Sequence, residues 1–383
     1  MSIEKSLRRH FPHTSKKVYF NAASNGPLPN PAFKIITDSN RIANMAAIGA
    51  RKELFSSLDS IRRNASKIFG CRQSETGFGF NTTFGINLAA FGLPLGKDDE
   101  VLLVDVEFPA NVYPWLELRN RGIKVKFIKT QNGFLNIDDL QKAITKKTKV
   151  VSISFVQFFN GHKNDLKKIG EICGKHKIYF VVDAIQGAGC EPLRVKDWGI
   201  DIASAGGQKW LLSPQGTGIF YASDRIQKII LPPWRSWLGV DWKANWSNFR
   251  NFNKSYVLGA QQYELGTYPV SLVNAIEWSL DFMLKNGIKN IQKHNHNLLD
   301  KLITYLKSEP YFQIASSLAQ KHRSSILSFR DTGDKIEDIY KYLTRKSIIT
   351  SLREGCIRVS VHLYNNESDM KTLISALRKC VPH

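Results

Sequence analysis

The feature that most constrains the fold is an alternation of short apolar runs with longer amphipathic stretches in the middle of the chain. The apolar runs predict β-strands at residues 100–108, 125–130, 149–157, 178–186, 200–207 and 216–223. Several of these runs are apolar at successive positions, which indicates strands buried on both faces. Helix-like stretches lie between them at residues 110–122, 136–148 and 164–177. This alternation predicts an α/β domain with a mainly parallel sheet between helices.

The pattern changes after about residue 260. Long helices are predicted at residues 271–287 and 291–309. Shorter elements follow, namely a strand over 324–331, a helix near 335–346, a strand over 356–363 and a last helix near 367–380. We therefore expect a large α/β domain over residues 16–260 and a small α+β domain that consists of residues 261–383 together with residues 1–15.

Composition excludes several classes of protein. The chain has 383 residues, 43% of them hydrophobic, which suits a large core. No run approaches 18 consecutive apolar residues, and the basic start has no apolar segment of a secretory signal. The five cysteines are odd in number and form no CxxC pair, so we expect neither a disulfide framework nor a zinc site. This use of cysteine fits a reducing compartment, and we expect the protein to be cytoplasmic.

The chain carries a formal net charge of +21. A basic surface can attract nucleic acid or anionic membranes. The basic residues are spread along the chain, however, and no nucleic-acid-binding motif accompanies them. The charge therefore favours a solvated, lysine-rich surface, and we expect no nucleic-acid or membrane partner.

Polar and aromatic residues follow the predicted strands, where ligands of open α/β sheets bind. Asn81, Thr82 and Thr83 stand at a strand-to-helix turn. Exposed N–H groups and two hydroxyls there suit a phosphate, although an ordinary threonine cap is the simpler interpretation of this turn alone. Phe108 ends another strand and could stack on a planar ligand, although taken alone it is more typical of a core.

Two charged residues follow the next strands. Asp183 ends an apolar run, where a carboxylate needs a cationic or hydrogen-bonded partner unless it caps a helix. Lys209 lies beyond the following strand, in "GGQKW". A lysine in a partly apolar cleft has a lowered pKa and a free amine that forms Schiff bases.

One cofactor uses all of these groups. Pyridoxal 5′-phosphate needs a lysine for its aldehyde, an acid for its pyridinium nitrogen, a phosphate cup and often an aromatic ring on its face. Each group is weak evidence alone. Their order at successive strand ends predicts this cofactor.

At this point the chain resembles the class V aminotransferase family of fold-type I pyridoxal-phosphate enzymes. That family includes cysteine desulfurases, kynureninase, isopenicillin N epimerase-like proteins and aminotransferases. The resemblance rests on "VYFNAASNGPLP", "NTTFGINLAA", "EFPANVYPW", "VVDAIQGAG", "GGQKW", "YELGTYP" and "IRVSVHLYNNESDM", in this order.

The resemblance implies a role for each cofactor contact. Lys209 would form the Schiff base, Asp183 would pair with the pyridinium nitrogen, and Gln186 would contact the ring hydroxyl. Phe108 would stack on the ring. The phosphate would be held by Thr82, Thr83 and Gln208, together with Thr267 of the neighbouring subunit, which implies a homodimer with shared active sites.

The resemblance also implies a substrate side of the site. Arg358 would bind the α-carboxylate of an amino acid, and Asn21 and Ala22 would lie beside the substrate. Arg353 is either a second carboxylate contact or a surface charge, and we favour the surface charge. The chain departs from the serine–glycine–histidine of desulfurases at Gly206, in place of serine, and at Gln208, in place of histidine, whereas Gly207 matches their glycine. It departs again at Phe158, where many members have asparagine.

The presence or absence of a nucleophilic cysteine distinguishes a desulfurase from the other enzymes of this family. In desulfurases a nucleophilic cysteine sits on a mobile loop shortly before the carboxylate-binding arginine. No cysteine occupies residues 346–355 here. Cys356 shares a strand face with Arg358 but has no flexible tether. Desulfurase chemistry is therefore disfavoured.

We expect an aminotransferase that acts on an amino acid and a 2-oxo acid. The alternatives are a β-elimination (C–S) lyase or an epimerase of the same family. A non-catalytic basic binding protein on this fold is supported only by the charge. We expect no metal, because His294 and His296 stand two residues apart in a predicted helix, where they do not share a face.

Overall fold

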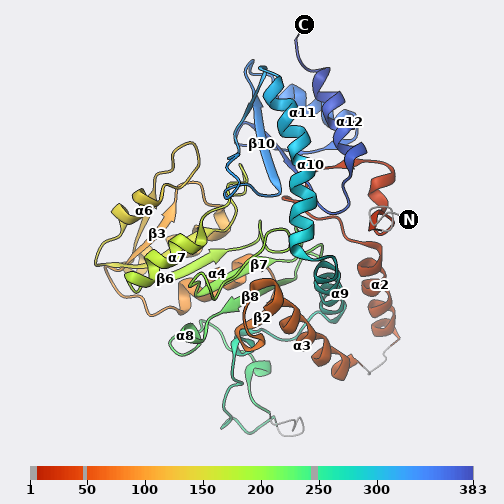
Figure 1. Ribbon diagram of the computed structural model, residues 1–383. Coiled ribbons are helices and arrows are strands. Elements are labelled where there is room, and N and C mark those ends of the chain that lie inside the picture. The colour runs from red at the N-terminus through yellow and green to blue at the C-terminus, as the bar shows by residue number, and fades with distance from the viewer. Residues whose placement is uncertain (1–6, 46–49, 243–248, 383) are drawn as a thin grey trace.

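A computed structural model describes residues 7–45, 50–242 and 249–382, and leaves the side chains of residues 50–53 undescribed. Its centre is a seven-stranded sheet with the strand order β2-β8-β7-β6-β5-β3-β4 (Figure 1). Only β8 runs antiparallel to its neighbours. The strands are β2 (Thr76–Gly79), β8 (Gly218–Ala222), β7 (Ile202–Gly206), β6 (Tyr179–Asp183), β5 (Thr148–Ser154), β3 (Glu100–Val104) and β4 (Lys124–Ile128). All six strands expected from the sequence are present.

Both faces of this sheet are buried, as the apolar runs predict, except at the edge strand β4, which is largely exposed. In β3, Leu102 and Val104 belong to one hydrophobic cluster and Val101 and Leu103 to another. Alternate side chains of a strand point to opposite faces, so the sheet contributes to two cores. The helices of this part are α2 (Asn30–Asn44), α3 (Ala50–Phe69), α4 (Thr82–Gly92), α5 (Tyr113–Glu117), α6 (Ile137–Ala143), α7 (Leu166–Lys175), α8 (Asp224–Gln227) and α9 (Val270–Asn286).

One expected helix is broken. Residues 110–122 form the five-residue α5 between two 3-10 turns, Pro109–Asn111 and Leu118–Arg121. Pro114 has no N–H to donate and a fixed φ, so it is tolerated in a first helical turn and α5 begins beside it.

A second, antiparallel sheet has the strand order β12-β13-β10-β9. It comprises β12 (Ser351–Arg353), β13 (Cys356–Ser360), β10 (Ile326–Asp331) and β9 (Phe312–Ile314), and α10 (Ile288–Ser308), α11 (Ile336–Arg345) and α12 (Glu367–Arg378) lie beside it (Figure 1). These strands and helices share a third hydrophobic cluster. This α+β arrangement matches the expected C-terminal part. The expected domain boundaries stay a prediction.

The N-terminal segment joins the two parts. β1 (Val18–Tyr19) pairs in parallel with β11 (Ile348–Ile349), and Asn21 bridges to Ser360 at the end of β13. Further along, Gly26 N–H donates to the Gln208 carbonyl at 2.7 Å. The segment therefore contacts both the small sheet and the loop after β7. Among the described residues, no helix has the length and apolar character needed to cross a bilayer.

Candidate active site

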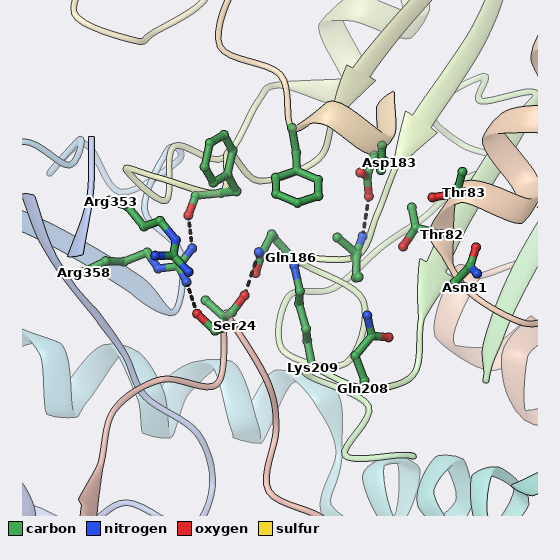
Figure 2. A pocket seen from close by; sticks show the side chains of 15 residues that line it. Ser24, Asn81, Thr82, Thr83, Asp183, Gln186, Gln208, Lys209, Arg353 and Arg358 are labelled. Carbon is green, nitrogen blue, oxygen red and sulfur yellow. Dashed lines mark hydrogen bonds between the residues drawn. The ribbon is translucent and has the colours of Figure 1, made fainter. Parts of the chain in front are cut away.

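A pocket of about 310 Å³ lies beyond the carboxyl ends of the parallel strands (Figure 2). Seven separate stretches of chain build it: the N-terminal segment, the β2–α4 turn, the four loops after β3, β5, β6 and β7, and the β12–β13 hairpin. Its walls are Ala23, Ser24, Asn81, Thr82, Thr83, Phe108, Ala110, Phe158, Asp183, Ile185, Gln186, Gln208, Lys209, Arg353 and Arg358. Eight of the predicted site residues therefore meet in one cavity.

Lys209 projects into the centre of this pocket from the loop after β7 (Figure 2). Its side chain is buried, and within the described ranges no hydrogen bond or ion pair engages its Nζ. Burial lowers the pKa of Lys209, whereas the nearby Asp183 raises it and the charges of Arg358 and Arg353 lower it further. The lysine thus holds an amine that loses its proton more easily than a surface lysine does.

Asp183 ends β6 with its carboxylate buried. One oxygen, Oδ1, accepts the Ile185 N–H at 3.0 Å. Burial raises the pKa of Asp183, and the charge of Lys209 lowers it. A buried carboxylate with one oxygen unused is suited to a cationic partner in the pocket.

The β2–α4 turn places its hydroxyls at the opposite end of the pocket from the two arginines (Figure 2). Asn81 is the N-cap of α4, and its side chain accepts the Phe84 N–H at 3.0 Å. The Thr82 hydroxyl accepts the Gly206 N–H at 2.9 Å, which leaves its own O–H to donate. Asn81 rather than Thr82 or Thr83 is therefore the cap, so both threonines remain for a ligand.

Arg358 lies on β13, and three hydrogen bonds fix the position of its guanidinium. Its Nε donates to Ser351 Oγ at 3.1 Å, its Nη2 to Ser24 Oγ at 2.7 Å, and its Nη1 to the Phe158 carbonyl. A guanidinium has five N–H donors, so one N–H on each terminal nitrogen is left for a carboxylate. Ser24 and the Phe158 carbonyl were not identified from the sequence.

Phe108 forms an exposed wall rather than part of the core. The residue is 39% exposed, the centroid of its ring lies 5.4 Å from Lys209 Nζ, and the ring packs edge-on against Phe158. The loop that carries it is held by the buried Glu107, which accepts hydrogen bonds from the Ser154 N–H and from Gln157. Glu107 was also missed, because a buried glutamate has no distinctive local pattern.

Three predicted residues lie outside the pocket. Ala22 is buried in the hydrophobic core, and the Asn21 backbone bridges to Ser360, so the next residues, Ala23 and Ser24, line the cavity instead. Thr267 is exposed and does not line the pocket of its own chain.

Two contacts differ in detail from those expected. The Gln186 amide donates to the Ala23 carbonyl at 3.0 Å and accepts the Trp210 indole N–H at 2.9 Å, so it bonds to protein as well as facing the pocket. Arg353, which we assigned to the surface, is exposed but also lines the pocket.

The β12–β13 hairpin closes with the two-residue turn Glu354–Gly355, whose φ angles are 46° and 69°. Positive φ at both positions is typical of the tight type I′ turn. Cys356 begins β13 directly after it, and its side chain is not among those that line the pocket. Burial raises the pKa of the Cys356 thiol. A thiol held in its protonated form is a poor nucleophile.

The two histidines of α10 have separate partners. His294 Nε2 lies 3.0 Å from the Asn365 carbonyl, and His296 Nε2 lies 3.2 Å from Glu191 Oε1. The part of the chain that the structure describes contains no group of three or more potential metal ligands.

Comparison with known proteins identifies the family. Residues 33–373 match the family model described as Aminotransferase class-V. The chain belongs to this class-V aminotransferase family. It is 27% identical to a probable cysteine desulfurase of Methanothermobacter thermautotrophicus over 97% of each protein. It is 23% identical to an uncharacterized aminotransferase of Bacillus subtilis, over 98% of this chain and 97% of the other.

Solved structures of the class-V family share the fold. The apo cysteine desulfurase from Thermococcus onnurineus NA1 superimposes with a TM-score of 0.89 at 21% identity, over 100% of this chain and 98% of the other. The cystine C–S lyase C-DES, in complex with cysteine persulfide, gives 0.87 at 22% identity, over 96% and 98%. The predicted family and fold are confirmed.

The protein is thus a class-V enzyme that depends on pyridoxal 5′-phosphate, as predicted. The pocket fits this cofactor. It has a buried amine and a buried carboxylate oxygen that no described residue engages in a hydrogen bond, together with hydroxyls beside a helix start and an exposed aromatic ring. Gly206 and Gly207 are closely packed: an added Cβ would lie 2.4 Å from Gln208 Oε1 and 2.4 Å from Thr217 Oγ1, respectively.

Proposed function

We propose that this enzyme is an amino-acid aminotransferase, in which Lys209 moves the proton and Arg358 holds the substrate. The observation that carries the proposal is the two-residue turn Glu354–Gly355. It stands where the desulfurase resemblance would require a mobile loop with a nucleophilic cysteine. Transamination needs no protein thiol, so the pocket has the groups it requires.

Three residues of the pocket would each have a separate role in this reaction. Bound pyridoxal phosphate supplies an aldehyde that condenses with amines and a ring that withdraws electrons from the substrate's α-carbon. The unused oxygen of Asp183 would keep a proton on the ring nitrogen. Lys209 Nζ would remove the proton from the α-carbon, which its lowered pKa permits near neutral pH. Arg358 would orient the α-carboxylate through its two remaining N–H groups.

A homodimer is part of this proposal. The exposed side chain of Thr267 does not serve its own pocket, and the family resemblance assigns it to the phosphate of a neighbouring subunit. A second copy of the chain would then complete each phosphate cup beside Thr82 and Thr83.

A β-elimination lyase is the second candidate. The cystine C–S lyase with a similar fold supports it, because elimination also needs no protein thiol. The two reactions differ in their products. We expect the holoenzyme to transfer nitrogen from an L-amino acid to 2-oxoglutarate, giving L-glutamate and a new 2-oxo acid. Release of ammonia and pyruvate from cystine or cysteine, without amino transfer to any 2-oxo acid, would replace the aminotransferase by the lyase.

Cys356→Ser tests the exclusion of persulfide chemistry. We expect this variant to keep at least half of the wild-type turnover, because the thiol does not line the pocket. A variant that loses turnover and sulfide release together, while it still binds the cofactor, would restore the desulfurase assignment.

A further inference from the structure

The cations of the pocket outnumber its acids. The titratable residues that line it are Asp183, Lys209, Arg353 and Arg358. Asp183 and the threonine end lie away from the two arginines, which stand side by side on the other wall (Figure 2). The phosphate of the cofactor belongs at the threonine end, so it does not neutralise the arginines. The arginine end therefore has two positive charges and no acidic residue among the described pocket walls.

One carboxylate satisfies only one of these arginines. Arg358 offers one free N–H on each terminal nitrogen, because Ser24, Ser351 and the Phe158 carbonyl hold its other donors. Two parallel N–H groups match one carboxylate in the bidentate geometry. The α-carboxylate of an amino acid thus fills the capacity of Arg358.

Arg353 remains without an anionic partner. Its guanidinium makes one hydrogen bond, from Nη1 to the Leu352 carbonyl at 2.8 Å, and no described carboxylate forms an ion pair with it. Its charge still reaches the site, since it lowers the pKa of both Arg358 and Lys209. Like charges held together are unfavourable unless an anion joins them.

We infer that Arg353 binds a second anionic group of the substrate, so that the enzyme acts on amino acids with an acidic side chain, a carboxylate or a sulfinate. This inference rests on the proposed function, because it places the substrate's α-carboxylate on Arg358. Of the other residues that line the pocket, Phe108, Ala110 and Phe158 have no side-chain group that can form a hydrogen bond with a neutral polar substituent.

The test compares ligands that differ by one charge. Isothermal titration calorimetry on the holoenzyme would measure succinate, with two carboxylates, against butanoate, with one. Steady-state kinetics would compare L-aspartate with L-asparagine, L-glutamate with L-glutamine, and L-cysteine sulfinate with L-cysteine. We expect the wild type to favour the acidic member of each pair by about tenfold or more, which corresponds to one charge-assisted contact.

Arg353→Gln should remove this preference. It should lower kcat/KM for the acidic substrates and weaken succinate about tenfold, with neutral substrates and butanoate changed less than about twofold. Arg330→Gln is the matched control, since it removes the same charge from an exposed arginine on β10 outside the pocket. This control should keep the wild-type preference.

Three results would overturn the inference. Equal losses for acidic and neutral ligands in Arg353→Gln would show that Arg353 shares the α-carboxylate with Arg358. A wild type that does not prefer acidic over neutral ligands would show that no second anion is bound. If Arg330→Gln lost this preference as much as Arg353→Gln, the cause would be the overall positive charge of the protein and not a contact with Arg353. If succinate binding depends on Arg353 but no amino acid is converted, the proposed function fails while the anion subsite stands.

Discussion

Gly26 is a position where adding a single methyl group should disturb the backbone of the active site. A Cβ built on Gly26 would lie 2.1 Å from the Lys209 carbonyl oxygen and 3.0 Å from Leu212 Cδ2. The Gly26 N–H also donates to the Gln208 carbonyl at 2.7 Å, so the segment cannot retreat without breaking that bond. Gly26→Ala must therefore move the backbone that carries Lys209. We expect a loss of about 2–4 kcal/mol, the sum of an overpacked core and one hydrogen bond.

The experiment compares Gly26→Ala with Gly174→Ala. Gly174 lies exposed in α7, and an added Cβ there meets nothing within 4 Å. Alanine should stabilise that helix by about 0.5–1 kcal/mol. The melting temperature and the visible absorption of the lysine-bound cofactor would be measured for both. If Gly26→Ala melts like the wild type and binds the cofactor equally well, the close contact with the Lys209 backbone is refuted.

Three further variants test the charged groups of the site. Asp183→Asn should keep the cofactor bound and lower kcat by about 10²-fold or more, measured by turnover at saturating cofactor; unchanged turnover would contradict the role of Asp183. Arg358→Lys should raise KM about tenfold, because lysine lacks the planar fork, and leave cofactor affinity unchanged; equal losses of both would make its role structural. Lys209→Met should stabilise the apoprotein at pH 7 by about 1–3 kcal/mol, because burial lowers the pKa of Lys209 to about 8 against about 10.4 unfolded. The unfolded chain binds this proton more tightly than the folded chain, so the wild type becomes more stable as the pH rises from about 8 to 10.4. The stability advantage of Lys209→Met over the wild type should therefore fade over the same range. A gain that persists above pH 10.4 in chemical denaturation would contradict this assignment.

Much of this site was predictable because its signals are local. Strands β3, β6 and β7 are almost wholly buried, so their sequences are compact apolar runs, and residues at or soon after the ends of these runs enter the pocket. Asp183 is the last residue of β6, and Lys209 lies in the loop that follows β7. The cofactor could therefore be inferred from the order of the residues along the chain.

The residues that escaped prediction depend on contacts between distant segments. Ser24 matters only because Arg358 reaches it across the interface between the two sheets. Arg353 enters the pocket because the tight turn after it sets the direction of β12. Asn21 and Ala22 were expected beside the substrate. The bridge between Asn21 and Ser360 instead holds Asn21 outside the pocket, and the residues that follow Ala22 line it. No sequence pattern near these residues reveals such pairings.

The path of the N-terminal segment has a consequence for the order of events during synthesis. Phe20 accepts the Ser360 N–H at 2.9 Å, Arg8 pairs with Asp369 at 2.8 Å, and the same segment then supports the backbone beside Lys209. Contacts between residues so far apart in the chain form slowly, because a long loop must close first. A nascent chain can build the central sheet before its last residues leave the ribosome, yet it cannot complete the lysine's surroundings. Capture of the cofactor would then mark the end of folding and report that both ends of the chain are in place.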